Sequence, residues 1–417
     1  MTATAAASAA PASGGPLRDP LFRRLWAGEV LASAAEALFV VCLVLLVVDV
    51  AGAGGTLGLV LAVAAIPRAV LLPFGGLLAD RVAPDRIVVA ATFARAALLA
   101  LLAVLVATGP PSIAVIATLA GVLGALDAAY YPAALTLLPK VVNASRLPAA
   151  NALVQGAESA GDLLGPALAA AAVTVAGLGG ALGAVSVLYL LAAIALATVA
   201  RRLGRTRAAR PPSANTASEP QGLAALREGL RYGWHEPVVR IVLIVLAVLN
   251  LAIIGPVLVG GAVLAELRFG GAENLGVLFI GFGIGALIGF SAAGSRPPQQ
   301  RGVVLIAGVA VLGVSTAALG FARSLDAAVA IAAVMGLGQA YLGVVLVAWL
   351  QERVPEALRG RVMSLVAFSA VALDPLSYAL AGALLPAGLG VLFGVCGALV
   401  LACAATILAT PSVRSLR

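Results

Sequence analysis

Residues 75–86 have the sequence Gly-Gly-Leu-Leu-Ala-Asp-Arg-Val-Ala-Pro-Asp-Arg and separate two long apolar runs. Asp80, Arg81 and Arg86 supply charges, and Pro84 is a residue that interrupts helices. A charged segment this short, between two runs of membrane length, indicates a tight loop joining two transmembrane helices. We expect this loop to lie on a face of the protein that is rich in cations.

The composition of the whole chain indicates a polytopic membrane protein. The chain has 417 residues, of which 62% are hydrophobic and 11% are charged, and its mean hydropathy is +1.11. Soluble proteins have about a quarter of their residues charged. One core could not enclose this much apolar surface, so we expect an all-α protein whose helices cross the bilayer.

Several other classes of protein are disfavoured. The net charge of +8 is spread over short loops and does not form one basic patch, so we expect no nucleic-acid partner. Cys42, Cys396 and Cys403 lie inside apolar runs, and His235 is the single histidine, so we expect no metal site and no cofactor. The chain has no Gly-x-Ser-x-Gly, no His-Glu-x-x-His and no phosphate-binding loop with lysine, so it is predicted not to be an enzyme or an ATP-driven pump.

Twelve apolar runs are each close to the ~20 residues that a helix needs to span a bilayer. The first six predicted helices cover residues 25–48, 56–79, 87–107, 112–138, 148–176 and 181–200. The second six cover residues 238–265, 275–294, 302–321, 326–350, 360–385 and 388–410.

Composition divides the chain into five segments. They are a disordered N-terminus at 1–16, a six-helix bundle at 17–200, a linker at 201–237, a second six-helix bundle at 238–410 and a tail at 411–417. In the linker, Leu223, Leu226, Leu230 and Trp234 recur at helical spacing, which predicts an amphipathic helix on the membrane surface. An irregular loop is the alternative.

The distribution of basic residues predicts the orientation. Of the 26 Lys and Arg residues, 22 fall in the two ends of the chain or in the loops after even-numbered helices. Arg268 and Arg323 lie on the opposite face, and Arg68 and Arg95 lie within helices. By the positive-inside rule, both termini and the linker are predicted to be cytoplasmic, in a multi-pass protein of the plasma or inner membrane.

The two halves have similar features. Residues 138–151 and residues 351–363 each combine an apolar helix end, a basic residue, a turn and a new helix. Gly165-Pro166 in the fifth helix corresponds to Asp374-Pro375 in the eleventh. A six-plus-six repeat is typical of transporters in which two bundles rock about a central site.

The loop at residues 75–86 resembles the loop between helices 2 and 3 of the major facilitator superfamily of transporters. The matching residues are Gly76, Leu78, Ala79, Asp80 and Arg81. Residues 23–28, 146–153, 227–232 and 354–362 resemble the branch that includes the enterobactin exporter and macrolide efflux proteins, also called transmembrane secretion effectors. The resemblance implies two six-helix bundles related by a pseudo-two-fold axis, with helices 1, 4, 7 and 10 lining a central cavity.

The resemblance also implies a conformational latch. Asp80 would lie against the start of helix 11, where the positive end of the helix dipole favours a carboxylate. The other predicted members are Gly76, Arg81, Arg86, Arg359 and Arg361. We expect Asp80→Asn to weaken transport and to leave membrane expression intact.

The predicted fifth helix contains Gly161-x-x-x-Gly165-Pro166. Small residues four apart let two helices approach closely, and proline permits a kink. This segment resembles the helix 5 pattern associated with antiporters, although plain helix packing explains the spacing equally well.

Ionisable residues inside the predicted helices are candidates for the transport site, because a charge at the bilayer centre costs roughly 2.5–3.5 kcal/mol on insertion scales. They are Glu29, Glu36, Arg68, Arg95, Asp127, Glu158, Asp162 and Asp374. The resemblance implies Glu36 and Asp127 as the best candidates for binding a proton or a cationic substrate. Glu29 is expected near the cytoplasmic end, in contact with solvent. The alternative is fixed ion pairing, for example of Asp162 or Glu29 with Arg95 or Arg68.

In the second half, Asn250, Gln339 and Tyr341 are candidates for lining the cavity, and Trp349 is expected to pack between helices. Acids in one half and apolar walls suit amphipathic or cationic molecules. The sequence therefore predicts a monomeric, proton-coupled exporter of a drug, a macrolide-like compound or a siderophore. A metabolite importer or facilitator, or a receptor that does not transport, remains the alternative.

Overall fold

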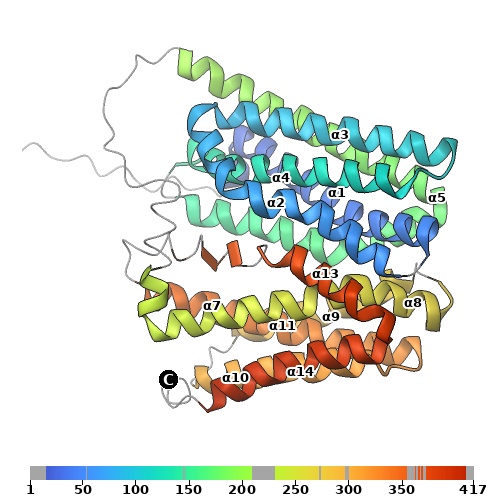
Figure 1. Ribbon diagram of the computed structural model, residues 1–417. Helices are drawn as coiled ribbons and strands as arrows, with labels where there is room; N and C mark the ends of the chain where they lie inside the picture. The colour runs from blue at the N-terminus through green and yellow to red at the C-terminus, as the bar shows by residue number, and fades with distance from the viewer. Residues whose placement is uncertain are drawn as a thin grey trace, which may run out of the picture.

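The computed structural model describes residues 16–52, 54–143, 146–208, 231–271, 274–295, 300–354, 362, 365–366, 368–369 and 372–409. The regular elements of this part of the chain are helices (Figure 1). A short 3-10 turn, Pro16–Arg18, precedes the first of them. The helices of the first half are α1 (Pro20–Ala51), α2 (Gly55–Arg81), α3 (Pro84–Thr108), α4 (Ile113–Val141) and α5 (Leu147–Ala208).

The second half begins with one long helix in four consecutive parts. These parts are α7 (Pro237–Leu249), the π-helical segments η3 (Asn250–Ile254) and η4 (Pro256–Gly260), and α8 (Gly261–Phe269), which we together call helix 7. The others are α9 (Asn274–Ser295), α10 (Arg301–Leu319), α11 (Leu325–Arg353), α13 (Asp374–Leu384), the 3-10 turn η5 (Leu385–Ala387) and α14 (Leu389–Leu408).

The number of membrane-spanning helices agrees with the prediction from the sequence. Ten described stretches are long and apolar enough to cross a bilayer. One of them, Leu168–Gly204, contains parts of both arms of α5, because that helix folds back at Gly177, where φ is 68°. Counting the two arms of α5 separately, the described helices account for eleven of the predicted spans. The 11-residue α13 covers the second part of the remaining one, 360–385, whose first part lies largely outside the described residues.

Glycine turns mark one end of the molecule. Gly52, Gly109, Gly177, Gly270 and Gly388 have positive φ values, and each follows a helix that runs toward the same end. We call this the glycine-turn end. The opposite end, which we call the linker end, carries the start of α1, the end of α5 and the start of α7 (Figure 1).

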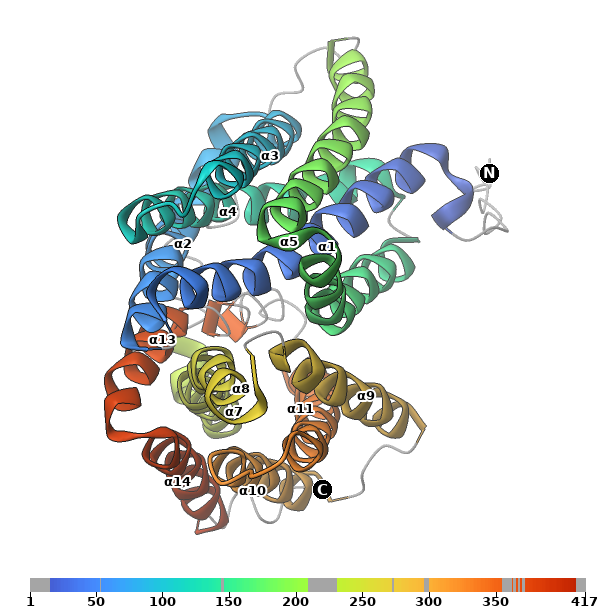
Figure 2. The same cartoon turned by 90° about the vertical axis from the view of Figure 1, so that its right-hand side faces the viewer.

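The helices form two bundles side by side (Figures 1 and 2). In the first bundle α1 and α3 pack on α5, and α2 packs on α4. In the second bundle α9 packs on α11, and α10 packs on α14. The bundles meet where α2 contacts α13, α5 contacts α9 and α1 contacts α8.

The contact between α2 and α13 lies at the glycine-turn end and is made by glycines. A Cβ atom on Gly58 would lie 2.6 Å from the carbonyl oxygen of Tyr378 and 2.8 Å from the Cα atom of Gly382. A Cβ atom on Gly382 would lie 3.0 Å from the carbonyl oxygen of Gly55. The two backbones are therefore in direct contact along this seam, which we call the glycine seam, and a larger residue would push them apart.

Three predictions about element boundaries need correction. The loop at 75–86 is shorter than expected, since α2 continues to Arg81 and Pro84 starts α3, a position that tolerates proline. The eleventh predicted helix, 360–385, is interrupted at residues 372–373, because Pro375 lacks the N–H that would continue the α-helical hydrogen bonds. Helix 7, predicted for residues 238–265, extends from Pro237 to Phe269, and its middle is π-helical. Residues 1–15, 209–230 and 410–417, which include most of the predicted amphipathic helix, lie outside the described residues.

Candidate functional site

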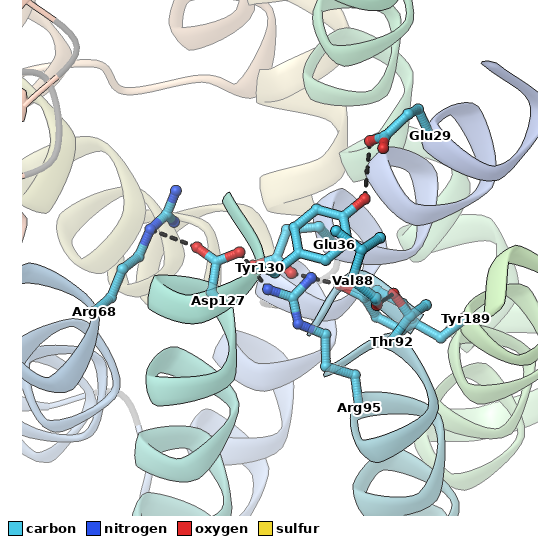
Figure 3. A network of polar contacts seen from close by, with 9 residues as sticks. All are labelled: Glu29, Glu36, Arg68, Val88, Thr92, Arg95, Asp127, Tyr130 and Tyr189. Carbon is cyan, nitrogen blue, oxygen red and sulfur yellow. Dashed lines mark hydrogen bonds and ion pairs between the residues drawn. The ribbon is translucent and has the colours of Figure 1, made fainter. Parts of the chain in front are cut away.

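A network of buried and partly buried charged and aromatic side chains occupies the first bundle and joins four of its helices to Arg68 of α2 (Figure 3). The Nε atom of Arg68 lies 2.6 Å from Oδ2 of Asp127 on α4. Arg95 of α3 donates a hydrogen bond to the other oxygen of Asp127. One carboxylate therefore faces two guanidinium groups in the membrane interior.

Close helix contact places Arg68 next to Asp127. Gly124 lies one turn before Asp127, and Ala64 lies one turn before Arg68. A Cβ atom on Gly124 would overlap the carbonyl oxygen of Ala64. Glycine at this position lets α2 and α4 approach to backbone contact, which brings the two charged side chains within bonding distance.

Arg95 is also enclosed by two tyrosine rings. Its guanidinium carbon lies 4.7 Å from the ring centroid of Tyr130 on α4 and 5.6 Å from that of Tyr189 on α5. Arg95 is 3% exposed, so these cation–π contacts form away from water, where they are strongest.

The hydroxyl groups of the same two tyrosines contact the two acids of α1. Tyr130 donates a hydrogen bond of 2.8 Å to Glu29, and Tyr189 donates one to Glu36. Glu29, Tyr130, Arg95, Tyr189 and Glu36 thus form a continuous chain of contacts, and Asp127 joins it through Arg95 (Figure 3).

The structure changes two expectations about these residues. Glu29 is 8% exposed and hydrogen-bonded, so the expected contact with solvent is wrong. Arg68 and Arg95 both pair with Asp127. Glu29, one of the acids suggested as a partner, accepts a hydrogen bond from Tyr130, and the side chain of Asp162, the other, lies outside the described part of the structure. Spacing along separate helices cannot reveal which acid lies opposite which arginine.

The glycines of the first arm of α5 lie against α1. A Cβ atom on Gly161 would lie 3.1 Å from the carbonyl oxygen of Ser33, and one on Gly165 would overlap Ala37. This contact lies beside Glu36 in the sequence of α1. Close packing is therefore present, and the suggested antiporter role of Gly161, Gly165 and Pro166 stays a prediction.

In the second bundle, Asn250 of helix 7 donates a hydrogen bond of 2.9 Å to Asp374 at the start of α13. Arg68 interacts electrostatically with Asp374 and with Glu36, which lie on different bundles. Gln339 is exposed and Tyr341 is partly buried. Among the described contacts, neither of them joins the network.

The predicted latch is described only in part. Gly76, Asp80 and Arg81 lie in the last two turns of α2, and Arg86 is exposed in the first turn of α3. Arg359 and Arg361 lie outside the described residues. The latch therefore stays a prediction.

Among the described residues there is no cluster of three His, Cys, Asp or Glu side chains that could hold a metal ion. The three cysteines are buried and form no disulfide.

The sequence did not indicate roles for Tyr189 and Ser377. A tyrosine in the middle of an apolar helix is the one signal that was available, because a buried hydroxyl needs a partner.

Comparison with known proteins identifies the family. The profile of the Major Facilitator Superfamily matches residues 25–373. The chain belongs to the Major Facilitator Superfamily. This confirms the family, the fold class and the absence of an enzymatic role that were expected from the sequence.

Named relatives of this superfamily member are efflux pumps. The chain is 27% identical over 381 residues to the multidrug efflux pump Tap of Mycolicibacterium fortuitum, covering 89% of each chain. It is also 27% identical to the multidrug efflux pump Tap of Mycobacterium tuberculosis (strain ATCC 25618 / H37Rv), covering 88% of this chain and 87% of that one.

Solved structures share the fold. A mutant of the nucleoside transporter NupG superposes with a TM-score of 0.71 at 11% identity, over 93% of this chain and 99% of that one. A POT family transporter solved with a peptide conjugate superposes with a TM-score of 0.69 at 13% identity, over 94% of this chain and 96% of that one. The protein is thus a multi-pass membrane transporter of the major facilitator fold, which acts on a small-molecule substrate within the lipid bilayer of the cell membrane.

Proposed function

We propose that this transporter exports small amphipathic molecules in exchange for protons. The observation that carries the proposal is the pair of α1 acids, Glu29 and Glu36, each bound to a tyrosine hydroxyl inside the first bundle. The relatives named as multidrug efflux pumps support the direction of transport.

The contacts of the network suggest two different roles for its acids, one for Asp127 and one for Glu29 and Glu36. Asp127 faces Arg68 and Arg95 and therefore has its charge balanced within the protein. Glu36 and Glu29 have neutral tyrosine hydroxyls as hydrogen-bond donors. A carboxylate in the membrane interior whose hydrogen-bond donor is a neutral hydroxyl is stabilised by a proton or by a cationic substrate, and competition between the two couples export to proton entry. Asp127 then positions Arg95, whose guanidinium lies between the two tyrosines.

The orientation follows from the charges. We propose that the linker end is cytoplasmic, because exposed arginines such as Arg201 and Arg202 lie there. The glycine seam then closes the extracellular side in this conformation, and the latch of α2 acts on the cytoplasmic side.

We further propose that the transporter works as a monomer and needs no cofactor. The proton gradient then supplies the energy for export.

The test is accumulation in cells that lack their own efflux pumps, with ethidium, erythromycin and a ferric siderophore as probes, each with and without a protonophore. Glu36→Gln and Glu29→Gln are compared with Asp49→Asn, a control acid that is exposed on the same helix. We expect the wild type and Asp49→Asn to lower accumulation, and the protonophore or either glutamine variant to abolish the effect.

Two results would contradict the proposal. Export that persists in both glutamine variants would show that the α1 acids do not couple export to proton entry. Faster entry of a metabolite, with none of the three probes exported, would favour an importer of the same fold.

A further inference from the structure

Helix 7 is under-wound in its middle. Residues Asn250–Ile254 and Pro256–Gly260 are π-helical, between the regular helices α7 and α8. A π-helical turn contains one more residue than an α-helical turn and frequently occurs at functional sites. Pro256 contributes to this distortion, because it has no N–H to donate to the preceding turn.

A hydroxyl group from another helix stabilises this segment. The Oγ atom of Ser377 on α13 accepts a hydrogen bond of 2.7 Å from the N–H of Gly255. It also donates one of 2.7 Å to the carbonyl oxygen of Leu251. In a regular α-helix these two backbone groups, four residues apart, would bond directly to each other. The Ser377 hydroxyl therefore takes the place of one hydrogen bond of the α-helical ladder.

The close approach depends on glycine. A Cβ atom on Gly255 would lie 2.8 Å from Oγ of Ser377 and would overlap the Ser377 carbonyl. One turn earlier on α13, Asp374 accepts the hydrogen bond from Asn250. Two side chains of α13 thus hold the under-wound segment, and Ser377 is fully buried.

The same helix forms the contact with the first bundle. Tyr378 and Gly382 of α13 lie against Gly58 of α2 at the glycine seam. The side chain that holds helix 7 is therefore adjacent in sequence to a residue of the seam. Any motion that separates α13 from α2 acts on a helix that also carries the Ser377 hydroxyl.

A small cavity lies beside the under-wound segment of helix 7. A cavity of about 20 Å³ adjoins the π-helical segment, lined by Val257, Gly261, Phe279, Phe282 and Met335 among others. Its lining is apolar, and protein interiors contain few such voids. A void of this size, about that of one water molecule, means that the π-helical segment is not fully packed on this side.

We propose that Ser377 is a positioning residue for transport, which keeps helix 7 in the π-helical form while the glycine seam is closed. When the seam opens, the π-helical segment Asn250–Ile254, where Ser377 bridges the backbone, returns to a regular α-helix. Loss of the one extra residue of this turn rotates α7 by about 100° relative to α8 and shifts it by about 1.5 Å. This movement carries Asn250 away from Asp374. The inference rests on the proposed function, since it assigns a role in the opening of the two bundles.

The test measures distances between spin labels in the purified transporter in lipid nanodiscs and needs no substrate. Cys42, Cys396 and Cys403 are replaced by alanine. One label pair joins Ile244→Cys on α7 to Val311→Cys on α10, and the control pair joins Leu267→Cys on α8 to Val311→Cys, all at exposed positions. In Ser377→Ala we expect the first distance to change by about 5–8 Å, from a 100° turn of a helix about 10–12 Å wide. The control distance stays constant, and Ser377→Thr, which keeps the hydroxyl, behaves as the wild type.

A second variant covers the case in which Ser377→Ala does not fold. Gly58→Leu leaves the Ser377 hydroxyl in place and opens the glycine seam, so we expect it to give the same change in the Ile244–Val311 distance. Gly183→Leu is its control, because a Cβ atom there meets no atom within 4 Å. An unchanged distance in folded Ser377→Ala or in folded Gly58→Leu would overturn the inference. Because no transported probe is involved, that result is separate from failure of the efflux assay.

Discussion

The Nε atom of Arg68 lies 2.6 Å from an oxygen of Asp127, across two helices that touch at Gly124. A basic residue in the middle of a membrane helix is costly unless an acid lies opposite it. Here one acid serves two arginines, since Arg95 contacts the other oxygen. We therefore expect the first bundle to depend on Asp127 for its stability.

Asp127→Asn should destabilise the protein. The change leaves the buried guanidinium of Arg95 and the partly exposed one of Arg68 without their counter-charge. Breaking a buried pair such as Arg95–Asp127 costs about 3–5 kcal/mol. We expect a clear fall in the thermal unfolding temperature of the purified transporter in detergent. Adding Arg68→Gln should recover part of the loss, because one unpaired cation is removed. An unchanged unfolding temperature in the single variant would show that the pair is not structural.

Gly124→Ala should separate α2 from α4. The new Cβ atom would overlap the carbonyl oxygen of Ala64, and overpacking of this kind costs roughly 1–3 kcal/mol. Gly183→Ala is the matched control, since its Cβ atom meets no neighbour within 4 Å and alanine favours a helix by about 0.5–1 kcal/mol over glycine. The thermal unfolding temperatures should move in opposite directions. Equal shifts would mean that the two helices do not touch at Gly124.

Tyr130→Phe and Tyr189→Phe should each weaken the network and keep the ring beside Arg95. A hydrogen bond to a charged group contributes about 1.5–3 kcal/mol, so each variant should unfold at a lower temperature and transport more slowly. Tyr131→Phe is the control at a neighbouring position, because the hydroxyl bound to Glu29 belongs to Tyr130. Wild-type transport by both network variants would indicate that the tyrosines contribute packing alone.

A disulfide across the glycine seam should arrest transport. Gly55→Cys and Gly382→Cys, in a background without the three native cysteines, place two thiols on backbones in contact. Oxidation should block transport by holding α2 against α13, and a reductant should restore it. The single cysteine variants are the controls. Continued transport by the fully cross-linked protein would show that the seam does not open.

The fold class was predictable because hydrophobic runs of fixed length leave few alternatives in a membrane. The sequence also placed Asp127, Glu36 and Arg68 within helices, and the cavity-lining role of helices 1, 4, 7 and 10 that the family resemblance implied stays a prediction. It did not show that Arg95 lies between Tyr130 and Tyr189, since those contacts join helices far apart in the sequence. Nor did it show the π-helical segment of helix 7, which depends on the hydroxyl of Ser377 on another helix.

The glycines of the glycine-turn end differ in kind from those of the seam. At Gly52, Gly109, Gly177 and Gly388 a Cβ atom would meet nothing within 4 Å, yet φ is positive with ψ between 155° and 175°. That backbone region is open essentially to glycine alone, whereas the left-handed Gly270 has a conformation that asparagine also adopts. Handedness, and not lack of room, therefore fixes these four positions. At the seam, a larger residue on one helix can be compensated by a smaller residue on the other. At the four turns no change elsewhere in the chain removes the backbone strain of an L-residue.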